Sequence, residues 1–200
     1  MNATTPAMVG KMDGWQVLWR RLDTRGIDAC RIRPAEAGWA IEGGATFVEN
    51  GAIASLSYQL LCDPGWKTRS ADVHGWIDGR DWRLRVQRGA EGWVMDGSVL
   101  AVGAGLLDVD LGFTPASNTN AIRRLALGIG EKAETTALWL DTSDWTLKPL
   151  LQTYERVSST RFAYASPQHG YEAALQVNAF GIVLEYPGLW RAEHVVSPAA

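Results

Sequence analysis

Cysteine is scarce in this chain of 200 residues, which contains only Cys30 and Cys62. The two lie far apart, and neither belongs to a Cys-x-x-Cys pair or to a cluster with histidine. The sequence therefore gives little support for a zinc site and less for a disulfide framework. Both residues are expected to be small buried side chains or free thiols. We predict no metal and no cofactor.

Long apolar runs are also missing. No segment approaches the roughly 18 uncharged apolar residues of a membrane-spanning helix. The first residues, MNATTPAMVGKMDGW, lack the basic and apolar regions of a secretion signal. We therefore expect no membrane span and a cytoplasmic location.

Charge of one sign is not concentrated in any segment. The formal net charge is −3, with 19 lysines and arginines scattered among 22 acidic residues. Because phosphate backbones are bound by basic stripes or patches, nucleic acid is not an expected partner.

Common catalytic signatures are absent too. The sequence has no Gly-x-Ser-x-Gly turn and no His-Glu-x-x-His motif, and its histidines, His74, His169 and His194, lie singly. These absences favour a protein that is not an enzyme.

Tryptophan, in contrast, is abundant, with ten residues spread from end to end. Core packing accounts for most of them. Each indole carries an N–H that needs a partner when it is buried, so many tryptophans in one domain also suit a wide internal cavity or an apolar groove.

Short segments of alternating polarity, separated by turn signals, extend along the chain. Asn50-Gly51 lies between two such segments and strongly favours a hairpin, because this pair tolerates positive φ. Asp78-Gly79 marks another reversal. In residues 81–88, apolar and basic side chains alternate, as in a strand with one buried face.

Roughly ten or more strands of this kind, with a helix expected only over residues 118–127, are too many for an open twisted sheet. We predict an all-β, mainly antiparallel fold with one or two short helices, in which a large sheet curls or closes into a β-barrel or half-barrel. The domain is expected to cover residues 15–192, between flexible segments at 1–14 and 193–200.

The segment 106–125, LLDVDLGFTPASNTNAIRRL, concentrates polar side chains behind one strand-like run. Alternation places Asp108 and Asp110 on one face of this strand, and the apolar residues between them on the core face. Residues 118–120 are expected to cap a short helix that carries Arg123 and Arg124. Carboxylates and guanidiniums would then meet, either at a binding site or in a structural network of ion pairs.

Several motifs together carry a resemblance to a known family. They are Trp19 to Asp23, Trp66 to Arg69, Leu107 to Ala116, Asn118 to Leu125, and Tyr186 to Arg191. With them the chain resembles the bacterial "putative glycolipid-binding" family, formerly a domain of unknown function, over nearly its whole length. The resemblance implies a barrel-like fold similar to bacterial lipoprotein carriers, with a hydrophobic cavity for a lipid or glycolipid.

A glycolipid needs an apolar slot for its chain and, at the mouth, polar groups that hydrogen-bond hydroxyls or a phosphate. Aromatic side chains near turns can also stack on a sugar ring. The predicted ligand-binding residues are Asp108, Asp110, Asn118, Asn120, Arg123, Arg124, Trp66, Arg69, Tyr154, Tyr186 and Trp190.

Two other functions remain open at this point. Asp108 and Asp110, with Cα atoms about 6 to 7 Å apart on a strand, could be the acid and base of a hydrolase acting on a glycoside or lipid. Alternatively, a tryptophan-rich surface could form the interface of a homodimer, with Asp-Arg pairs fixing its register. A cation at the two carboxylates is disfavoured, because nearby arginines would neutralise them.

Overall fold

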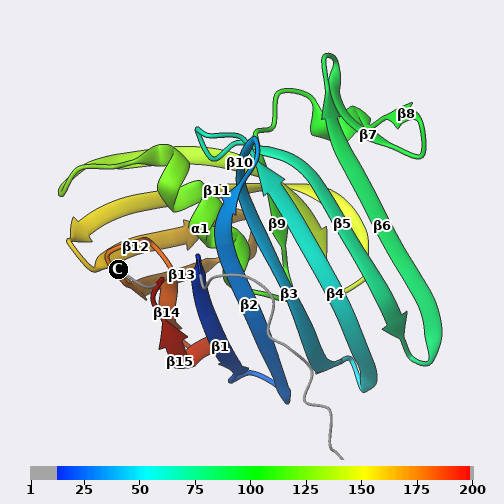
Figure 1. Ribbon diagram of the computed structural model, residues 1–200, viewed down its shortest axis with the longest axis horizontal. Helices are drawn as coiled ribbons and strands as arrows, with labels where there is room; N and C mark the ends of the chain where they lie inside the picture. Colours follow the sequence, from blue (N-terminus) through cyan, green and yellow to red (C-terminus); the bar gives the residue numbers. More distant parts are fainter. Residues whose placement is uncertain (1–12, 199–200) are drawn as a thin grey trace, which may run out of the picture.

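The structure is a computed structural model that describes residues 13–198. Its dominant feature is one 15-stranded sheet, which is mainly antiparallel and curls around a single α-helix (Figure 1). The elements are β1 (Trp15–Arg21), β2 (Gly26–Ala35), β3 (Gly38–Glu49), β4 (Ala52–Cys62), β5 (Thr68–Ile77), β6 (Arg80–Gly89), β7 (Gly92–Met95), β8 (Ser98–Val99), η1 (Ala101–Gly103), β9 (Asp108–Leu111), α1 (Ala116–Leu125), β10 (Lys132–Asp141), β11 (Thr146–Ser158), β12 (Arg161–Ser166), η2 (Pro167–His169), β13 (Tyr171–Val177), β14 (Val183–Tyr186) and β15 (Trp190–Val196).

The strand order is simple. Nearly every strand pairs with its neighbours in the chain, and β1 pairs with β15, so the first and last strands lie side by side in the middle of the sheet. The two edges are β8 and β9. Among the described strands, β9 and β10 form the one parallel pair, and α1 forms the crossover between them. Figure 1 shows this helix on the concave side of the sheet.

The sheet curls until its β9 edge approaches the start of β5. The backbone N–H of Thr68 donates to the carbonyl oxygen of Leu107 at 2.9 Å, and the N–H of Val109 donates to Thr68 Oγ1 at 3.3 Å. Strands β6 to β8 continue beyond this contact. The fold is therefore a curled, open barrel, which confirms the predicted all-β class and resolves the choice between a curled and a closed sheet.

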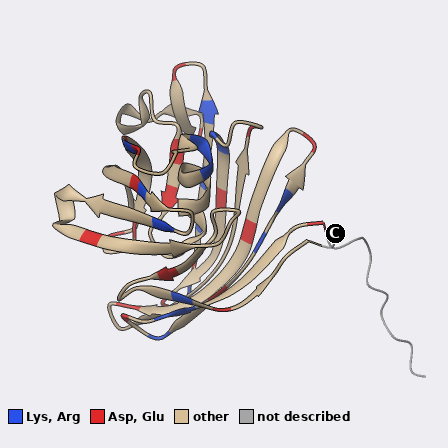
Figure 2. Ribbon diagram, turned by 90° about the vertical axis from the view of Figure 1, so that its left-hand side faces the viewer, with Lys and Arg blue, Asp and Glu red and all other residues tan. Residues whose placement is uncertain are grey.

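The predicted hairpins and alternation are present. Asn50 and Asp78, which precede the turn glycines, adopt φ values of 50° and 52°. In β6, Leu84 and Val86 face the core whereas Arg83 and Arg85 are exposed. Acidic and basic residues are interspersed over the sheet (Figure 2), and on its outer face they form cross-strand ion pairs such as Arg85 with Asp72 on β5.

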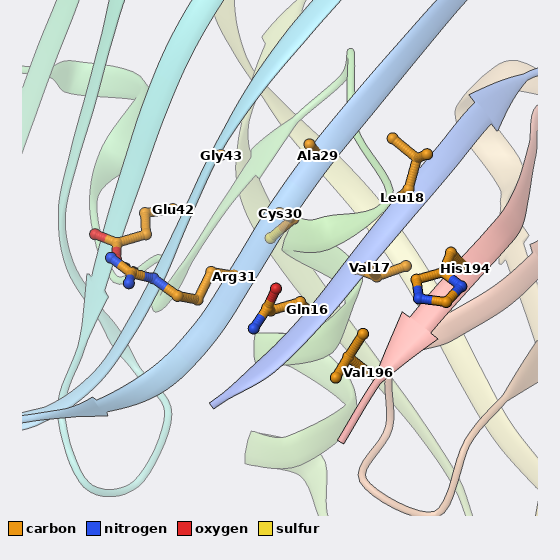
Figure 3. A pocket seen from close by; sticks show the side chains of 10 residues that line it. All are labelled: Gln16, Val17, Leu18, Ala29, Cys30, Arg31, Glu42, Gly43, His194 and Val196. Atoms are coloured by element: carbon orange, nitrogen blue, oxygen red, sulfur yellow. Dashed lines mark hydrogen bonds and ion pairs between the residues drawn. The ribbon is translucent and has the colours of Figure 1, made fainter. Parts of the chain in front are cut away.

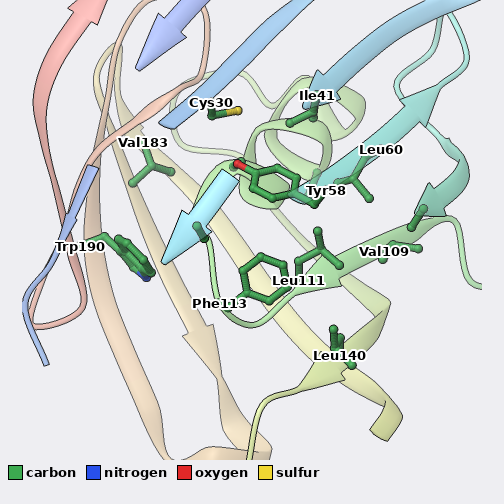
Figure 4. Close-up of a cluster of buried hydrophobic side chains, with 14 of the residues drawn as sticks. Cys30, Ile41, Tyr58, Leu60, Val109, Leu111, Phe113, Leu140, Val183 and Trp190 are labelled. Atoms are coloured by element: carbon green, nitrogen blue, oxygen red, sulfur yellow. The ribbon is translucent and has the colours of Figure 1, made fainter. Parts of the chain in front are cut away.

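Large apolar and aromatic side chains fill the space between the sheet and α1 (Figure 4). Trp19 and Trp93 are fully buried, and their indole N–H groups donate to the carbonyl oxygens of Val183 at 2.7 Å and Leu106 at 3.0 Å. Cys30 and Cys62 are buried free thiols, in agreement with the prediction. Core packing therefore occupies much of the interior in which the tryptophan content had suggested a wide cavity.

Three details differ from the sequence-based expectations. Helix α1 begins at Ala116 with Pro115 as its N-cap and no side-chain cap bond, so residues 118–120 lie inside the helix rather than capping it. Strand β9 is buried on both faces, because α1 covers the face that was expected to be open. Strand β15 extends to Val196, so the predicted tail from residue 193 starts too early. The expected flexible segment 1–14 lies almost wholly outside the described residues.

Within the described part of the chain, no helix has the length and apolar character needed to cross a membrane.

Candidate ligand-binding site

A cavity of about 260 Å³ lies at the start of α1, where that end of the helix meets strands from both sides of the curl. Its lining comes from β9 and the turn after it, from α1, and from β10 to β15. The lining residues are Asp110, Gly112, Thr114, Pro115, Asn118, Trp139, Leu150, Tyr164, Ser166, His169, Tyr171, Tyr186, Leu189 and Trp190. We call this space the aromatic cavity.

Six of the fourteen lining residues carry aromatic rings. The Tyr164 ring meets the Tyr186 ring edge to face at a centroid distance of 5.6 Å, and Tyr171 lies 5.7 Å from Tyr186. On the other side, Trp139 and His169 make an edge contact at 5.0 Å. Such rings present flat apolar faces together with polar tips, which suits a ligand that has both kinds of surface.

Gly112 explains how Trp139 can reach the cavity wall. A Cβ atom at residue 112 would lie 2.7 Å from Trp139 Nε1 and 2.7 Å from the carbonyl oxygen of Leu140. The missing side chain lets the indole pack directly against the backbone that follows β9. Any larger residue at this position would push Trp139 away.

Asp110 supplies the carboxyl group of the cavity. Ser117 Oγ donates to its Oδ1 at 3.0 Å, and Gln152 Nε2 donates to its Oδ2 at 2.6 Å. Among the described residues, no lysine or arginine forms an ion pair with it. Burial raises the pKa of Asp110 to about 6, although both hydrogen bonds favour the charged form.

Two further polar groups face this space. Asn118 uses its Nδ2 to donate to the buried Tyr154 hydroxyl at 2.9 Å. Ser166 is 4% exposed, and its hydroxyl has no hydrogen-bond partner in the described structure. A buried hydroxyl without a partner costs roughly 1 to 3 kcal/mol. An unsatisfied group in a cavity wall is therefore a candidate ligand contact.

Thr114 connects the cavity wall to a second buried carboxyl. Its hydroxyl donates to Asp28, which is fully buried and also accepts a hydrogen bond from Tyr58 Oη at 2.9 Å. No cation pairs with Asp28 in the described residues. Burial raises the pKa of Asp28 to about 7, although these two hydrogen bonds act in the opposite direction.

Asp108 belongs to a different environment from Asp110. Arg124 Nε donates to both of its oxygens, at 2.9 and 3.1 Å, and Asn120 Nδ2 donates to Oδ1 at 3.3 Å. The Arg124 guanidinium also donates to Thr135 on β10 at 2.7 Å. Asp108 is 2% exposed and does not line the aromatic cavity. This network ties α1 to β9 and β10.

The structure therefore divides the predicted site residues. Four of them line the aromatic cavity, namely Asp110, Asn118, Tyr186 and Trp190, and Tyr154 accepts a hydrogen bond from Asn118. Three others, Asp108, Asn120 and Arg124, form the buried network. The remaining three, Trp66, Arg69 and Arg123, lie outside both groups. The guanidinium of Arg123 lies over the rings of Trp66, at 5.5 Å, and Phe180, at 4.8 Å. Arg69 is exposed on β5.

A larger hollow of about 590 Å³ lies on the exposed face of β15, β1, β2 and β3 (Figure 3). Short side chains such as Ala29 create it. Its carboxylate, Glu42, already pairs with Arg31 and Arg33. This hollow is broad, and none of the buried side-chain polar atoms that lack a partner in the described structure lies in its lining, so we consider the aromatic cavity the better candidate.

The sequence and the fold can both be compared with known proteins. A family model described as "Putative glycolipid-binding" matches residues 16–192. The chain belongs to this family. None of the curated proteins matches the sequence.

Two solved structures resemble this member of the glycolipid-binding family. The crystal structure of a DUF1089 family protein from Pseudomonas aeruginosa is 27% identical, with a TM-score of 0.68, and the match covers 96% of this chain and 99% of that one. A β-barrel-like protein with the domain of unknown function DUF1849, from Brucella abortus, is 8% identical, with a TM-score of 0.53 and coverages of 95% and 99%. The second likeness concerns the fold alone.

Sequence reasoning missed several lining residues of this family member. Tyr164 and Ser166 could have been found, because they alternate with more exposed residues along β12 and so share its buried face. Trp139 had no such signal. Its position depends on the space left by Gly112, which lies far from it in the sequence.

Proposed function

We propose that this protein binds the uncharged sugar head group of a glycolipid in the aromatic cavity and does not transform it. One observation carries the proposal: the lining combines tyrosine and tryptophan rings with a carboxyl, an amide and hydroxyl groups, and contains no lysine or arginine. The family description, "Putative glycolipid-binding", points to the same class of ligand.

The polar groups suit a sugar. Asp110 and Asn118 can hydrogen-bond ring hydroxyls, while the faces of Tyr186 and Trp190 offer apolar surfaces for the C–H side of a pyranose. Ser166 holds a hydroxyl that a ligand hydroxyl would satisfy. These contacts require a ligand that is both a donor and an acceptor.

The charge of the cavity disfavours an anionic head group. Its one carboxyl, Asp110, has no cationic partner among residues 13–198, so a phosphate or carboxylate bound beside it would meet a like charge at neutral pH. A neutral polyol meets no such repulsion. Charge therefore supports a sugar over a phosphate at this site.

The size of the cavity sets how much of the ligand it holds. Pockets that enclose a whole drug-sized molecule are usually about 300 to 1,000 Å³, and this one is about 260 Å³. The space suits one head group, with the lipid chain leaving through the mouth. This differs from the expectation of a long apolar slot, because core side chains occupy the interior of the curl.

The same geometry speaks against the hydrolase alternative. Two carboxyl groups normally flank a scissile glycosidic bond. Only Asp110 lines the aromatic cavity, and Asp108 is held by Arg124 outside it. Binding without turnover is therefore the simpler use of this site.

Removal of Trp139 tests the proposal. The W139A variant is expected to bind octyl glucoside about 30-fold more weakly than the unsubstituted protein, because truncation of an aromatic anchor typically costs at least about 2 kcal/mol of binding. Calorimetric titration measures the affinity. The matched control is W76A, which truncates an exposed tryptophan on β5 outside the cavity. Equal affinities for W139A and W76A would contradict the proposal.

Ser166 gives a second test in which binding and stability change in opposite directions. The S166A variant removes a buried hydroxyl that has no partner. We expect its free energy of unfolding to rise by about 1 kcal/mol and its affinity for octyl glucoside to fall. Urea unfolding and the same titration measure the two quantities. A residue with a purely structural role would lower stability when replaced.

A further inference from the structure

A second pocket, of about 230 Å³, lies at the opposite end of α1 from the aromatic cavity. The last turn of the helix forms one wall, the end of β11 and the start of β12 form another, and the turn between β13 and β14 forms the third. We call it the arginine pocket, after Arg123 on α1 and Arg156 on β11.

These two arginines are not neutralised by the protein. Neither forms an ion pair in the described residues, in contrast to Arg124 in the same helix. Arg156 donates through Nη1 to the carbonyl oxygen of Leu127 at 2.9 Å and through Nε to that of Ser158 at 3.4 Å, and Arg123 Nη1 donates to that of Phe180 at 3.4 Å. A guanidinium has five N–H donors, so most donors of both groups remain available.

Aromatic rings hold both guanidiniums in place. Arg123 lies over the Phe180 ring at 4.8 Å, and Arg156 lies over the Phe162 ring at 5.9 Å. A ring face attracts a guanidinium at these distances and leaves its N–H groups free to donate. The two charges are therefore positioned before any ligand arrives.

Asn178 adds a third donor at the same pocket. Its Oδ1 accepts hydrogen bonds from the backbone N–H groups of residues 180, 181 and 182, at 3.0, 3.0 and 2.9 Å, which fixes the orientation of the amide. Its Nδ2 is buried and has no hydrogen-bond partner in the described structure. A buried N–H group without an acceptor points to a missing acceptor.

We propose that the arginine pocket binds a phosphate group. Its polar side chains are Arg123, Arg156, Asn178 and Ser159, and no carboxylate lines it. Donors from three different elements suit a tetrahedral oxyanion, whose oxygens accept from several directions, and arginine pairs with phosphate through two parallel N–H groups. The phosphate belongs either to a soluble ester or to a lipid head group.

This site is independent of the sugar-binding cavity. The two share no lining residue, and their nearest lining residues on α1, Asn118 and Ile122, are separated by about 6 Å along the helix axis. Loss of phosphate binding should therefore leave binding of octyl glucoside unchanged. Failure of one proposal would not imply failure of the other.

Titration of the full chain with inorganic phosphate at constant ionic strength tests the inference. R123Q and R156Q are each expected to weaken binding by about tenfold or more, because each removes a charged donor. R156K keeps the charge and can still donate to the carbonyl oxygen of Leu127, so it is expected to fold even if R156Q does not. The control is R161Q, which removes an exposed arginine on β12 that does not line the pocket. Its affinity should stay within about twofold of the unsubstituted protein.

The lipid source is tested with phosphatidylcholine vesicles that contain or lack phosphatidic acid. Binding of inorganic phosphate that depends on Arg123 and Arg156 supports a soluble ester. Binding only to phosphatidic acid vesicles, with the same dependence, supports a lipid phosphate. Absence of binding to both inorganic phosphate and phosphatidic acid vesicles would overturn the inference. A loss of affinity in R161Q as large as that in R123Q would also overturn it, because the attraction would then be diffuse.

Discussion

Replacement of Arg124 by methionine is expected to lower the free energy of unfolding by about 3 to 5 kcal/mol, because it leaves a buried carboxylate without its cation. Asp108 is 2% exposed, and Arg124 is the one basic side chain that pairs with it in the described structure. Urea unfolding monitored by tryptophan fluorescence measures the change. If these residues bound ligand instead, stability would be nearly unaffected.

Two further variants make this result specific. The double variant D108N/R124M removes both charges, so most of the lost stability should return. R191M breaks the exposed ion pair with Glu185 and should cost less than about 1 kcal/mol. Equal losses in R124M and R191M would contradict the role of the buried network.

Replacement of Asp28 by asparagine is expected to stabilise the protein at neutral pH. The pKa of Asp28 is about 7 in the folded protein, against an ordinary value of 3.8. The folded state thus binds this proton more tightly than the unfolded state. The stability that the carboxyl contributes is fully present below pH 4 and is lost as pH rises toward 7.

An amide cannot ionise, so D28N should escape this loss. At about 1.4 kcal/mol per pKa unit, the free energy of unfolding of the variant should exceed that of the unsubstituted protein by about 4 kcal/mol at pH 8, and the two should be nearly equal at pH 4. Urea unfolding at a series of pH values measures the difference. A difference that does not change with pH would show that folding does not raise the pKa of Asp28.

Local sequence signals predicted the parts of this fold that depend on neighbours in the chain. Asn50-Gly51 forms its hairpin, and β6 alternates as expected, because turn geometry and side-chain direction are set within a few residues. The parallel pairing of β9 with β10 was not predicted. It depends on α1 folding back over the sheet, which local patterns do not report.

The candidate site was predicted in part for the same reason. Alternation correctly placed Asp108 and Asp110 on one face of β9, toward α1. It could not predict that Arg124 would pair with Asp108, or that Gln152, from a distant strand, would donate a hydrogen bond to Asp110. A carboxylate paired with an arginine is structural, whereas one without a cation is available to a ligand. Tertiary packing determines which partner each carboxylate has.

Helix α1 organises both proposed sites. Its first turn supplies Asn118 to the aromatic cavity, its middle anchors the Asp108 network through Asn120, and its last turn supplies Arg123 to the arginine pocket. The buried network thus holds in place the helix on which both sites depend. Stability of this network and preorganisation of the sites are linked.

Binding of an uncharged sugar head group in the aromatic cavity can be observed by native mass spectrometry. The full chain is offered octyl glucoside or octyl glucuronide, which differ by one carboxylate. We expect a one-to-one glucoside adduct that W76A retains and W139A loses, and a much weaker glucuronide adduct. Equal adducts with both probes, or an adduct that W139A retains in full, would contradict it.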